Sequence, residues 1–244
     1  MSRQDVAWQG EEAVRWFLGS VRGAIPFSAE QLRVMLAMVD TGRQPVKRVL
    51  DVGAGDGLLA AVMLARYPQS DAVLVDFSAP MLDAARERLA ALSARFVFVE
   101  ADLATPGWLD AVAADTPFDA VVSGFAIHHL EDERKRALYG EIFDLLAPGG
   151  AFAHIEHVAP EAPWIAHAFD EAIVDAIWEH DRRAAPAMTR EAAATAYASR
   201  PDRDANRLAL VDIQCTWLRE AGFVDVVTPF RWYEIAVFGG YRPA

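Results

Sequence analysis

Short apolar runs alternate with longer amphipathic segments through the middle of the chain, between residues 46 and 150. The longer segments, of roughly 10 to 16 residues, repeat their apolar side chains at helical spacing, whereas the short runs are typical of strands. Five strands are predicted, over 49–52, 72–75, 96–99, 118–123 and 151–158. This alternation predicts repeated β-α-β units and a parallel sheet covered by helices.

The flanking segments have helical patterns without this alternation. Ser28 and Gln31 predict a capping box for a helix that ends near Gly42. Residues 159–206 are rich in alanine and proline. Because they follow the fifth strand, at the carboxyl edge of the sheet, we expect them to form a substrate lid. The other predicted elements are helices over 6–21, 164–180, 189–199 and 206–221 and strands over 223–228 and 232–238.

These elements predict a single domain. A chain of 244 residues that is 53% hydrophobic can bury a substantial core. We divide it into a helical cover (1–45), a core (46–157), a helical lid (159–206), and a C-terminal helix with a strand pair (207–244).

A glycine-rich turn follows the first predicted strand. Asp51 lies at the end of that strand, and Gly53, Gly55 and Gly57 follow in a G-x-G-x-G spacing. These glycines indicate a tight backbone that a ligand approaches closely, and the next helix points its N-terminal amides at the turn. Because a carboxylate repels phosphate and attracts an ammonium group, Asp51 argues against the dinucleotide that a G-x-G-x-x-G turn binds.

The turn resembles the first motif, D-x-G-x-G-x-G, of the class I S-adenosylmethionine (SAM) methyltransferases. SAM carries an ammonium, a sulfonium and ribose hydroxyls and no phosphate, which suits Asp51. Asp76 ends the second predicted strand, where an acid in doubly wound folds binds ribose hydroxyls. The resemblance implies an α/β fold with a doubly wound, mostly parallel seven-stranded sheet (Rossmann-like), an antiparallel last strand and a helical lid.

Further motifs of this family follow in order. Phe77 and Met81 resemble the residues beside the adenine or ribose, and 101–103 resembles the motif that recognises the adenine. Residues 118–123 resemble the fourth strand of the family, and 146–150 the turn into the fifth. The resemblance implies SAM as the cofactor, bound by Arg22, Asp51, Gly53, Ala54, Gly55, Asp76, Phe77, Met81, Ala101, Asp102, Leu103, Ser123, Gly124 and Phe125.

Two segments resemble carboxy-SAM synthases, which use an unusual form of the cofactor. In the stretch from Arg22 to Phe27, the arginine faces either the carboxylate of the methionine tail or the solvent. The stretch 217–223 also resembles that family, but Trp217 stands where the family has an arginine that binds the extra carboxylate. Because an indole cannot form that ion pair, we expect ordinary SAM.

The chain has a net charge of −12, with 23 lysines and arginines against 35 acids. This charge opposes the phosphate contacts of a nucleic-acid methyltransferase, so we expect no nucleic-acid partner. No apolar stretch is long enough for a signal peptide or a membrane span, and we expect no membrane partner. The single cysteine, Cys215, fits a reducing compartment, so we expect a cytoplasmic enzyme.

Candidate catalytic residues follow the fourth and fifth predicted strands. Methyl transfer needs an oriented acceptor, exclusion of water and, for some acceptors, a base. His128 and His129 are adjacent, so only one of them can face the cofactor, and we expect His129 to organise the loop. Glu156 should lie at a strand tip as a base or hydrogen-bond acceptor, and the alternative is an exposed acid paired with an arginine. We assign catalysis to Glu156, His128 and His157.

These side chains also raise the question of a divalent metal, because imidazole and carboxylate groups are metal ligands. Methyltransferases of this fold that orient a catechol on a metal use chiefly carboxylate and amide ligands, and the sequence has no matching spacing. We therefore expect no metal.

The predicted function is transfer of the methyl group of SAM to an oxygen, nitrogen or sulfur atom of a small-molecule acceptor. Two alternatives stay open: a nucleic-acid or protein methyltransferase, and a SAM-binding protein of the carboxy-SAM type that does not methylate. The sheet motifs supply few groups for a substrate, so we expect the acceptor between the cover and the lid. Its candidate contacts are Trp16, Phe17, His128, Trp164, Phe169 and Trp178. The sequence leaves a homodimer open.

Overall fold

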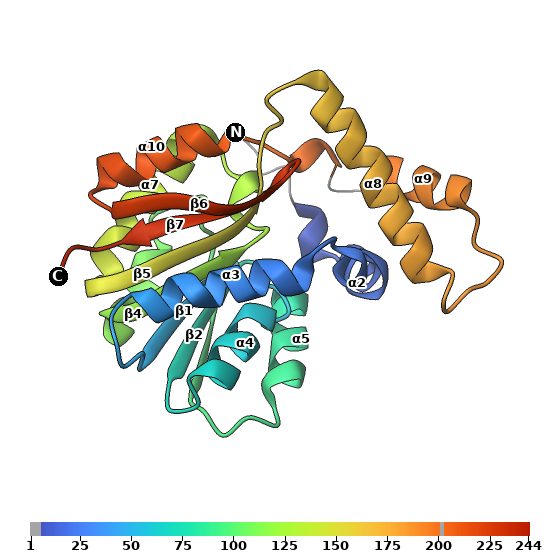
Figure 1. Cartoon of the computed structure of the whole chain (residues 1–244). Helices are drawn as coiled ribbons and strands as arrows, with labels where there is room; N and C mark the ends of the chain where they lie inside the picture. The colour runs from blue at the N-terminus through green and yellow to red at the C-terminus, as the bar shows by residue number, and fades with distance from the viewer. Residues whose placement is uncertain (1–5, 201–202) are drawn as a thin grey trace.

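The structure is a seven-stranded sheet with helices on both faces and a helical arm beyond one edge (Figure 1). A computed structural model describes residues 6–200 and 203–244, apart from the side chains of residues 6, 7, 12, 16, 20 and 204. The strand order is β3-β2-β1-β4-β5-β7-β6. The strands are β1 (Arg48–Val52), β2 (Asp71–Asp76), β3 (Phe96–Glu100), β4 (Phe118–Gly124), β5 (Leu146–His157), β6 (Val224–Trp232) and β7 (Ile235–Tyr241).

Two hydrophobic layers cover the sheet. Met35, Met63 and Leu89 belong to the layer formed by α3, α4 and α5, whereas Leu138 and Leu218 belong to the opposite layer with α7 and α10.

The helices before the lid are η1 (Val6–Gln9), α1 (Glu11–Trp16), η2 (Phe17–Val21), α2 (Arg22–Ala24), α3 (Ser28–Thr41), α4 (Leu58–Arg66), α5 (Ala79–Leu89), α6 (Trp108–Val112), η3 (Ala113–Asp115), η4 (Ile127–His129) and α7 (Asp132–Leu145). The later ones are α8 (Pro163–Asp181), α9 (Arg190–Ala198), η5 (Arg203–Ala205) and α10 (Val211–Ala221).

The central strands are continuous apolar runs because both of their faces are covered. In β1, every residue after Arg48 is buried. Parallel pairing of β1 with β2 and β4, and of β4 with β5, brings the carboxyl ends of these strands to one edge of the sheet. In folds of this kind ligands bind at that edge, near the point where the strand order reverses.

The last strand, β7, is antiparallel to its neighbours and lies between β5 and β6. Its register sets Phe238 beside His154 and Ala236 beside Glu156. The predicted α/β fold, with a mostly parallel seven-stranded sheet and an antiparallel last strand, is therefore confirmed.

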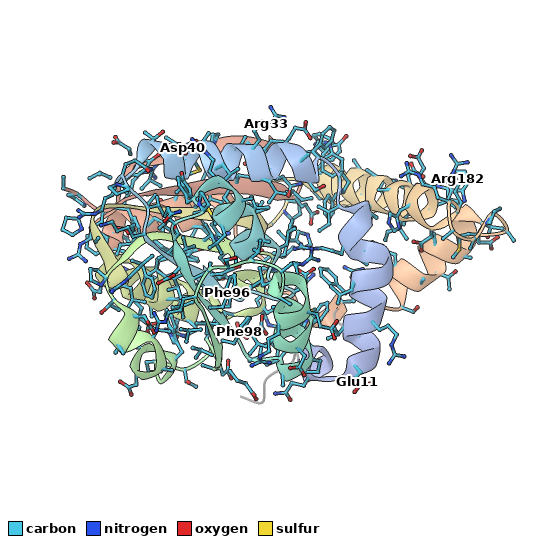
Figure 2. The ribbon with its side chains drawn as sticks, turned by 90° about the horizontal axis from the view of Figure 1, so that it is seen from below. Glu11, Arg33, Asp40, Phe96, Phe98 and Arg182 are labelled. Carbon is cyan, nitrogen blue, oxygen red and sulfur yellow. The ribbon has the colours of Figure 1, made fainter. Side chains whose placement is uncertain are left out.

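The cover and the lid meet beyond the carboxyl edge of the sheet (Figure 1). Ala24 of α2 packs with Ile177 of α8 and Ala193 of α9 in a small hydrophobic cluster. Figure 2 shows α3, marked by Arg33 and Asp40, along the sheet, and Arg182 near the far end of the arm. Within the described ranges, no helix combines the length and the apolar character needed to cross a membrane.

Two local predictions are wrong. Phe27 is the N-cap of α3 with a left-handed φ of 56°, so Ser28 is already helical and its side chain forms no capping hydrogen bond. Gln31 instead donates its side-chain N–H to the carbonyl of Pro26 at 2.6 Å. The predicted turn at 146–150 lies inside β5, because Leu146 already pairs with β4.

Candidate active site

The glycine turn between β1 and α4 is built on left-handed backbone. Gly53, Gly55 and Gly57 have φ values of 67°, 53° and 72°, a region that other residues rarely adopt. A Cβ on Gly53 would lie 2.2 Å from the Cβ of Ala126, whereas one on Gly55 would meet nothing within 4 Å. Close packing therefore requires a glycine at position 53, and Gly55 faces open space.

That space belongs to a hollow of about 780 Å³, which we call the glycine cavity and which is open to solvent. It lies between the turn, α5, the loop after β4 and the cover. Most of the predicted cofactor residues line it: Arg22, Gly53, Ala54, Gly55, Asp76, Phe77, Met81, Leu103, Gly124 and Phe125. Its other lining residues are Trp8, Phe17, Asp56, Ala126, His129 and Leu130.

The carboxylate of Asp76 is buried in the wall of the glycine cavity. It accepts hydrogen bonds from the backbone N–H groups of Gly55 and Ser78, each at 2.8 Å. Ser78 in turn caps α5, as its hydroxyl accepts from the Met81 amide. A carboxylate at the end of the second strand is the group that binds ribose hydroxyls in doubly wound folds.

Asp51 lines an adjoining hollow of about 920 Å³, which we call the aspartate cavity. The two hollows share Arg22, Gly53, Ala54, Gly124 and Phe125. Oδ2 of Asp51 accepts from the Ala60 amide at 3.0 Å, but the buried Oδ1 has no partner among the described residues. Burial raises the pKa of Asp51 to about 8, against the lowering effects of the Ala60 amide and the Arg22 charge. An ammonium group beside Oδ1 would supply the missing donor.

Arg22 belongs to a partly buried ion-pair network at the base of the cover. Its Nη2 lies 3.0 Å from Oδ1 of Asp56, and Oδ2 of Asp56 is paired with Arg88. Burial lowers the pKa of Arg22, although the Asp56 charge opposes this shift. Its buried Nε has no acceptor in the part of the chain that the structure describes. The alternative of a solvated surface arginine is therefore wrong.

Three predicted cofactor residues line neither the glycine cavity nor the aspartate cavity. Ser123 is fully buried, and its hydroxyl donates at 2.7 Å to a carbonyl of β1, so it ties β4 to β1. Asp102 accepts from a backbone amide two residues later at 2.8 Å and shapes the turn after β3. Ala101 precedes that turn, and only Leu103 of this motif lines the cavity. The Ser123 hydroxyl is thus used inside the sheet, and contact of Ser123 with a cofactor stays a prediction.

A further hollow of about 710 Å³, which we call the histidine cavity, lies between the cover, the lid and the sheet edge. Trp8, Phe17, Phe125 and His129 line both it and the glycine cavity, so the two adjoin. The rest of its wall is formed by Val21, Ile25, His128, His157, Phe169, Ile173, Tyr197, Arg200, Asn206 and Ile235. The structure thus brings together four predicted residues: Phe17, His128, His157 and Phe169.

Phe125 lies where the three cavities meet. Its φ is 52°, and its N–H donates to the carbonyl of Ile155 at 2.9 Å. Left-handed backbone at a residue other than glycine costs on the order of 1–3 kcal/mol and is concentrated at functional sites. The loop after β4 therefore maintains a strained conformation that places Phe125 at this junction.

His128 and Glu156 form a buried pair in the wall of the histidine cavity. Nδ1 of His128 donates to Oε1 of Glu156 at 2.6 Å, and the His128 N–H donates to Oε2 at 3.0 Å. His128 keeps 7% of its surface exposed and lines the cavity. With its Nδ1 proton held by a carboxylate, a neutral imidazole has Nε2 as its basic nitrogen. Nε2 is thus the nitrogen available to a ligand.

Glu156 itself is 0% exposed and lines none of the three cavities. It also accepts from Nε2 of His154 at 2.9 Å and from the N–H of His157 at 2.8 Å. Burial disfavours its charge, but electrostatic attraction to His128 and His154 and the hydrogen bonds from both outweigh burial and hold the pKa of Glu156 well below its usual range. The prediction of an accessible base is wrong, as is the alternative of an exposed acid, because hydrogen-bond donors enclose the carboxylate.

His129 and His157 flank His128, with ring centroids 4.0 Å and 5.6 Å from its own. Nε2 of His157 lies 2.8 Å from Oε2 of Glu234, and Nδ1 of His129 lies 3.4 Å from the carbonyl oxygen of Ala205. Burial lowers the pKa of both imidazoles, so they are uncharged at neutral pH. His129 does organise its loop, but it also lines both cavities.

Two predicted acceptor contacts, Trp164 and Trp178, lie outside the histidine cavity. Trp164 is 65% exposed near the start of α8, and Trp178 donates its Nε1 to the Met188 carbonyl at 3.0 Å inside the lid. Neither lines the histidine cavity, because the face of α8 that turns toward it carries Phe169 and Ile173. The side chain of Trp16, a third predicted contact, lies outside the described residues.

Within residues 6–200 and 203–244, no three His, Cys, Asp or Glu side chains are grouped to hold a metal ion. The absence of a metal and the homodimer both stay predictions.

Sequence reasoning missed several residues of the site, chiefly Trp8, Asp56, Asn206 and Glu234. Asp56 had a local signal, because it stands between the second and third glycines of the turn. Glu234 had none, since its contact with His157 depends on how β7 pairs with β5. Trp8 and Asn206 come from distant parts of the chain that meet only in the folded protein.

Comparisons with known proteins agree with this geometry. A family profile described as a methyltransferase domain matches residues 49–150. An uncharacterised methyltransferase of Mycobacterium bovis is 42% identical over 124 residues, which are 51% of this chain and 56% of that protein. A trans-aconitate 2-methyltransferase of Methylobacterium radiotolerans is 30% identical over an alignment of 223 positions, which covers 80% of this chain and 78% of that protein.

Among solved structures, the mitomycin 7-O-methyltransferase MmcR superposes with a TM-score of 0.61 at 14% identity, over 100% of this chain and 61% of that one. At that identity, the likeness shows the fold alone. The chain spans about half the length of the first curated relatives that it matches. The trans-aconitate relative covers most of both chains, and its match extends well beyond the glycine turn. The chain therefore belongs to the class I SAM-dependent methyltransferases, with SAM as the methyl donor.

Proposed function

We propose that the protein transfers the methyl group of SAM to a hydroxyl oxygen of a small, largely apolar acceptor, with His128 as the general base. The observation that carries this proposal is the pair of His128 and Glu156, which lies in the wall of a cavity that adjoins the glycine cavity. A neutral imidazole in this position is suited to take the proton of a hydroxyl.

The residues of the glycine and aspartate cavities fit SAM. Asp76 would accept the ribose hydroxyls, the unpaired Oδ1 of Asp51 would accept from the ammonium, and Nε of Arg22 would donate to the carboxylate. Gly55 leaves room for the cofactor, because a Cβ there would meet no protein atom within 4 Å. When bound, SAM supplies a methyl group on a positively charged sulfur that leaves readily.

In the proposed step, the acceptor hydroxyl gives its proton to Nε2 of His128 while its oxygen bonds to the methyl carbon. The electron pair of the broken carbon–sulfur bond stays on the sulfur. Glu156 stabilises the imidazolium that forms, as the buried carboxylate does in other pairs of histidine and acid. Phe17, Phe125 and His129 line both cavities and so mark the place where donor and acceptor would meet.

The walls of the histidine cavity support an uncharged, apolar acceptor. Phe169 and Ile173 contribute apolar surface, while Glu156 and Glu234 are hydrogen-bonded to histidines. A cationic amine would therefore find little compensation for its charge and would be repelled by the sulfonium.

The two alternative functions have less support. A net charge of −12 opposes a nucleic-acid substrate, whose phosphates would need neutralising. For a carboxy-SAM type of activity, the position that the resemblance assigns to the extra carboxylate is Trp217, which packs against the hydrophobic core and lines none of the three cavities.

The test is transfer of labelled methyl from SAM to matched panels of phenols, anilines and thiols by the full chain. We expect phenols to be preferred and His128→Asn to lower kcat by about 100- to 10,000-fold. SAM affinity, measured by calorimetry, should stay the same, because His128 does not line the glycine cavity. His167→Asn, on the exposed side of α8, is the matched control. An unchanged kcat in His128→Asn, or transfer to amines alone, would refute the proposal.

A further inference from the structure

A second histidine lies behind Glu156, on the side away from the histidine cavity. His154 is fully buried in β5 and lines none of the three cavities. Its Nε2 donates to Oε2 of Glu156 at 2.9 Å. Nδ1 is also buried and has no partner among the described residues. His154 therefore cannot touch a substrate, and it leaves one polar nitrogen unsatisfied.

The surroundings of His154 are apolar and aromatic. Its ring centroid lies 4.9 Å from that of Phe238, 5.5 Å from that of Phe152 and 6.3 Å from that of Tyr139. A phenylalanine would fill this space without an unpaired nitrogen. The imidazole is therefore explained by its one polar contact, the hydrogen bond to Glu156, and not by packing.

That hydrogen bond completes the restraint on the carboxylate. Oε1 of Glu156 accepts from the side chain of His128 and the backbone of His157, whereas Oε2 accepts from the backbone of His128 and the side chain of His154. In the part of the chain that the structure describes, His154 is the only side chain besides His128 that donates to Glu156. Without it, Oε2 would keep one backbone donor and the carboxylate would be freer to rotate.

We infer that His154 is a positioning residue for methyl transfer: it holds Glu156 ionised and aligned, so that His128 keeps its proton on Nδ1 and presents Nε2 to the acceptor. This inference rests on the proposed function of His128 as the base. Its chain of contacts runs from β5 through Glu156 to η4, and every hydrogen bond in it is 3.0 Å or shorter.

Other titratable groups near this chain of contacts are accounted for. Tyr139 of α7 faces it with a hydroxyl that donates to Gln214 at 2.6 Å, and the pKa of Tyr139 is raised well above its usual value, mainly by burial and then by the Glu156 charge. Cys215 of α10 lies near Tyr139, and burial raises the pKa of its thiol. Both groups are thus neutral at the pH of an assay. His129 and His157 are neutral as well, so Glu156 is the charge that His154 meets.

The test compares His154→Phe with His154→Gln, because a glutamine amide can restore a donor to Oε2. We expect His154→Phe to lower kcat roughly 10-fold, a part of the factor of about 100 to 10,000 that a general base contributes. The acid limb of its pH–kcat profile should move to higher pH. Without His154, the Glu156 carboxylate would have His128 as its only side-chain partner and would favour the protonated form of His128. His154→Gln should recover most of both effects, and the KM for SAM should not change.

A second readout does not depend on catalysis. With ¹⁵N-labelled histidine and no acceptor present, two-bond ¹H–¹⁵N spectra should show a single Nδ1–H tautomer for His128 in the native protein and a mixture in His154→Phe. Failure of the native protein to methylate any hydroxyl would refute the proposed function but leave this tautomer test in force. An unchanged tautomer and an unchanged pH profile in a folded His154→Phe variant would overturn the inference. If His154→Phe does not fold, the native protein is compared with His154→Gln instead. The same single His128 tautomer in both proteins would support the inference, and a mixture of His128 tautomers in His154→Gln would contradict it.

Discussion

At the scale of single residues, Asp51 is a buried carboxyl whose hydrogen bonds are incomplete. The carboxyl is buried, accepts one amide hydrogen bond and has an unpaired Oδ1. Buried charges without full compensation shift their pKa and take up a proton. We therefore expect Asp51 to lower the free energy of unfolding of the protein. An ammonium group that donates to Oδ1 should remove this destabilisation.

This expectation gives a prediction with a definite sign. Burial raises the pKa of Asp51 from 3.8 to about 8, so between these values the folded protein holds a proton that the unfolded chain releases. The free energy of unfolding should then fall as pH rises through this window, by at most about 1.4 kcal/mol per pH unit. Asp51→Asn should remove this slope, raise stability at pH 8 and weaken SAM binding.

Urea denaturation from pH 5 to pH 8, with calorimetry of SAM binding, measures these effects. Asp110→Asn is the matched control, because Asp110 is exposed on α6 and lies outside the three cavities. If Asp51→Asn keeps the full pH dependence of the native protein, Asp51 is not the proton-binding group.

At the scale of elements, one acid joins three segments beside the glycine and aspartate cavities. Asp56, in the glycine turn, pairs with Arg22 of α2 and with Arg88 of α5. Arg22 is thus oriented by the turn that also lines the glycine cavity. The short helix α2 has little stability of its own, since isolated helices of this length do not form. The Asp56 network therefore helps to hold the cover against the glycine turn.

The cover gives a second prediction. Arg22→Gln should weaken SAM binding by about 10- to 100-fold, which corresponds to a lost charged hydrogen bond of roughly 1.5–3 kcal/mol. Arg22→Lys should fall in between, because lysine keeps the charge but loses the fork of donors. Arg15→Gln, an exposed position in the same cover, is the control. Calorimetric affinities equal to that of the native protein would show that Arg22 does not contact the cofactor.

The elements also show what a sequence can predict. The strands and the glycine turn can be predicted from local patterns. A short apolar run and closely spaced glycines are recognised from neighbouring residues alone, without knowledge of distant contacts. The burial of Glu156 cannot be predicted in this way, since its partner His128 is 28 residues away and β7 covers the strand from the C-terminal end of the chain. Phe169 lines the histidine cavity and Trp164 does not, because of how α8 is rotated about its own axis. The spacing of apolar residues along the sequence does not determine this rotation.

At the scale of the whole molecule, the glycine cavity and the histidine cavity are lined by different parts of the chain. Every lining residue of the glycine cavity precedes residue 131, and none comes from the lid. The histidine cavity takes Phe169, Ile173, Tyr197, Arg200 and Asn206 from the lid segment. The segment is also anchored next to His128, because the amide of Arg207, which directly follows it, donates to the His128 carbonyl at 2.7 Å. SAM binding and acceptor binding should therefore be separable.

The last prediction uses this separation. Replacing most of the lid, from α8 through α9, by a short flexible linker should abolish measurable methyl transfer, because the acceptor loses one wall of its cavity and water enters. SAM affinity should stay within a few-fold of the native value, since the glycine and aspartate cavities keep all of their lining residues. Phe169→Ala should raise the KM for the acceptor without changing SAM affinity, whereas Trp164→Ala, at an exposed site on the same helix, should change neither. A folded deletion variant that methylates the same acceptor at the native rate would mean that the acceptor binds elsewhere on the carboxyl edge of the sheet.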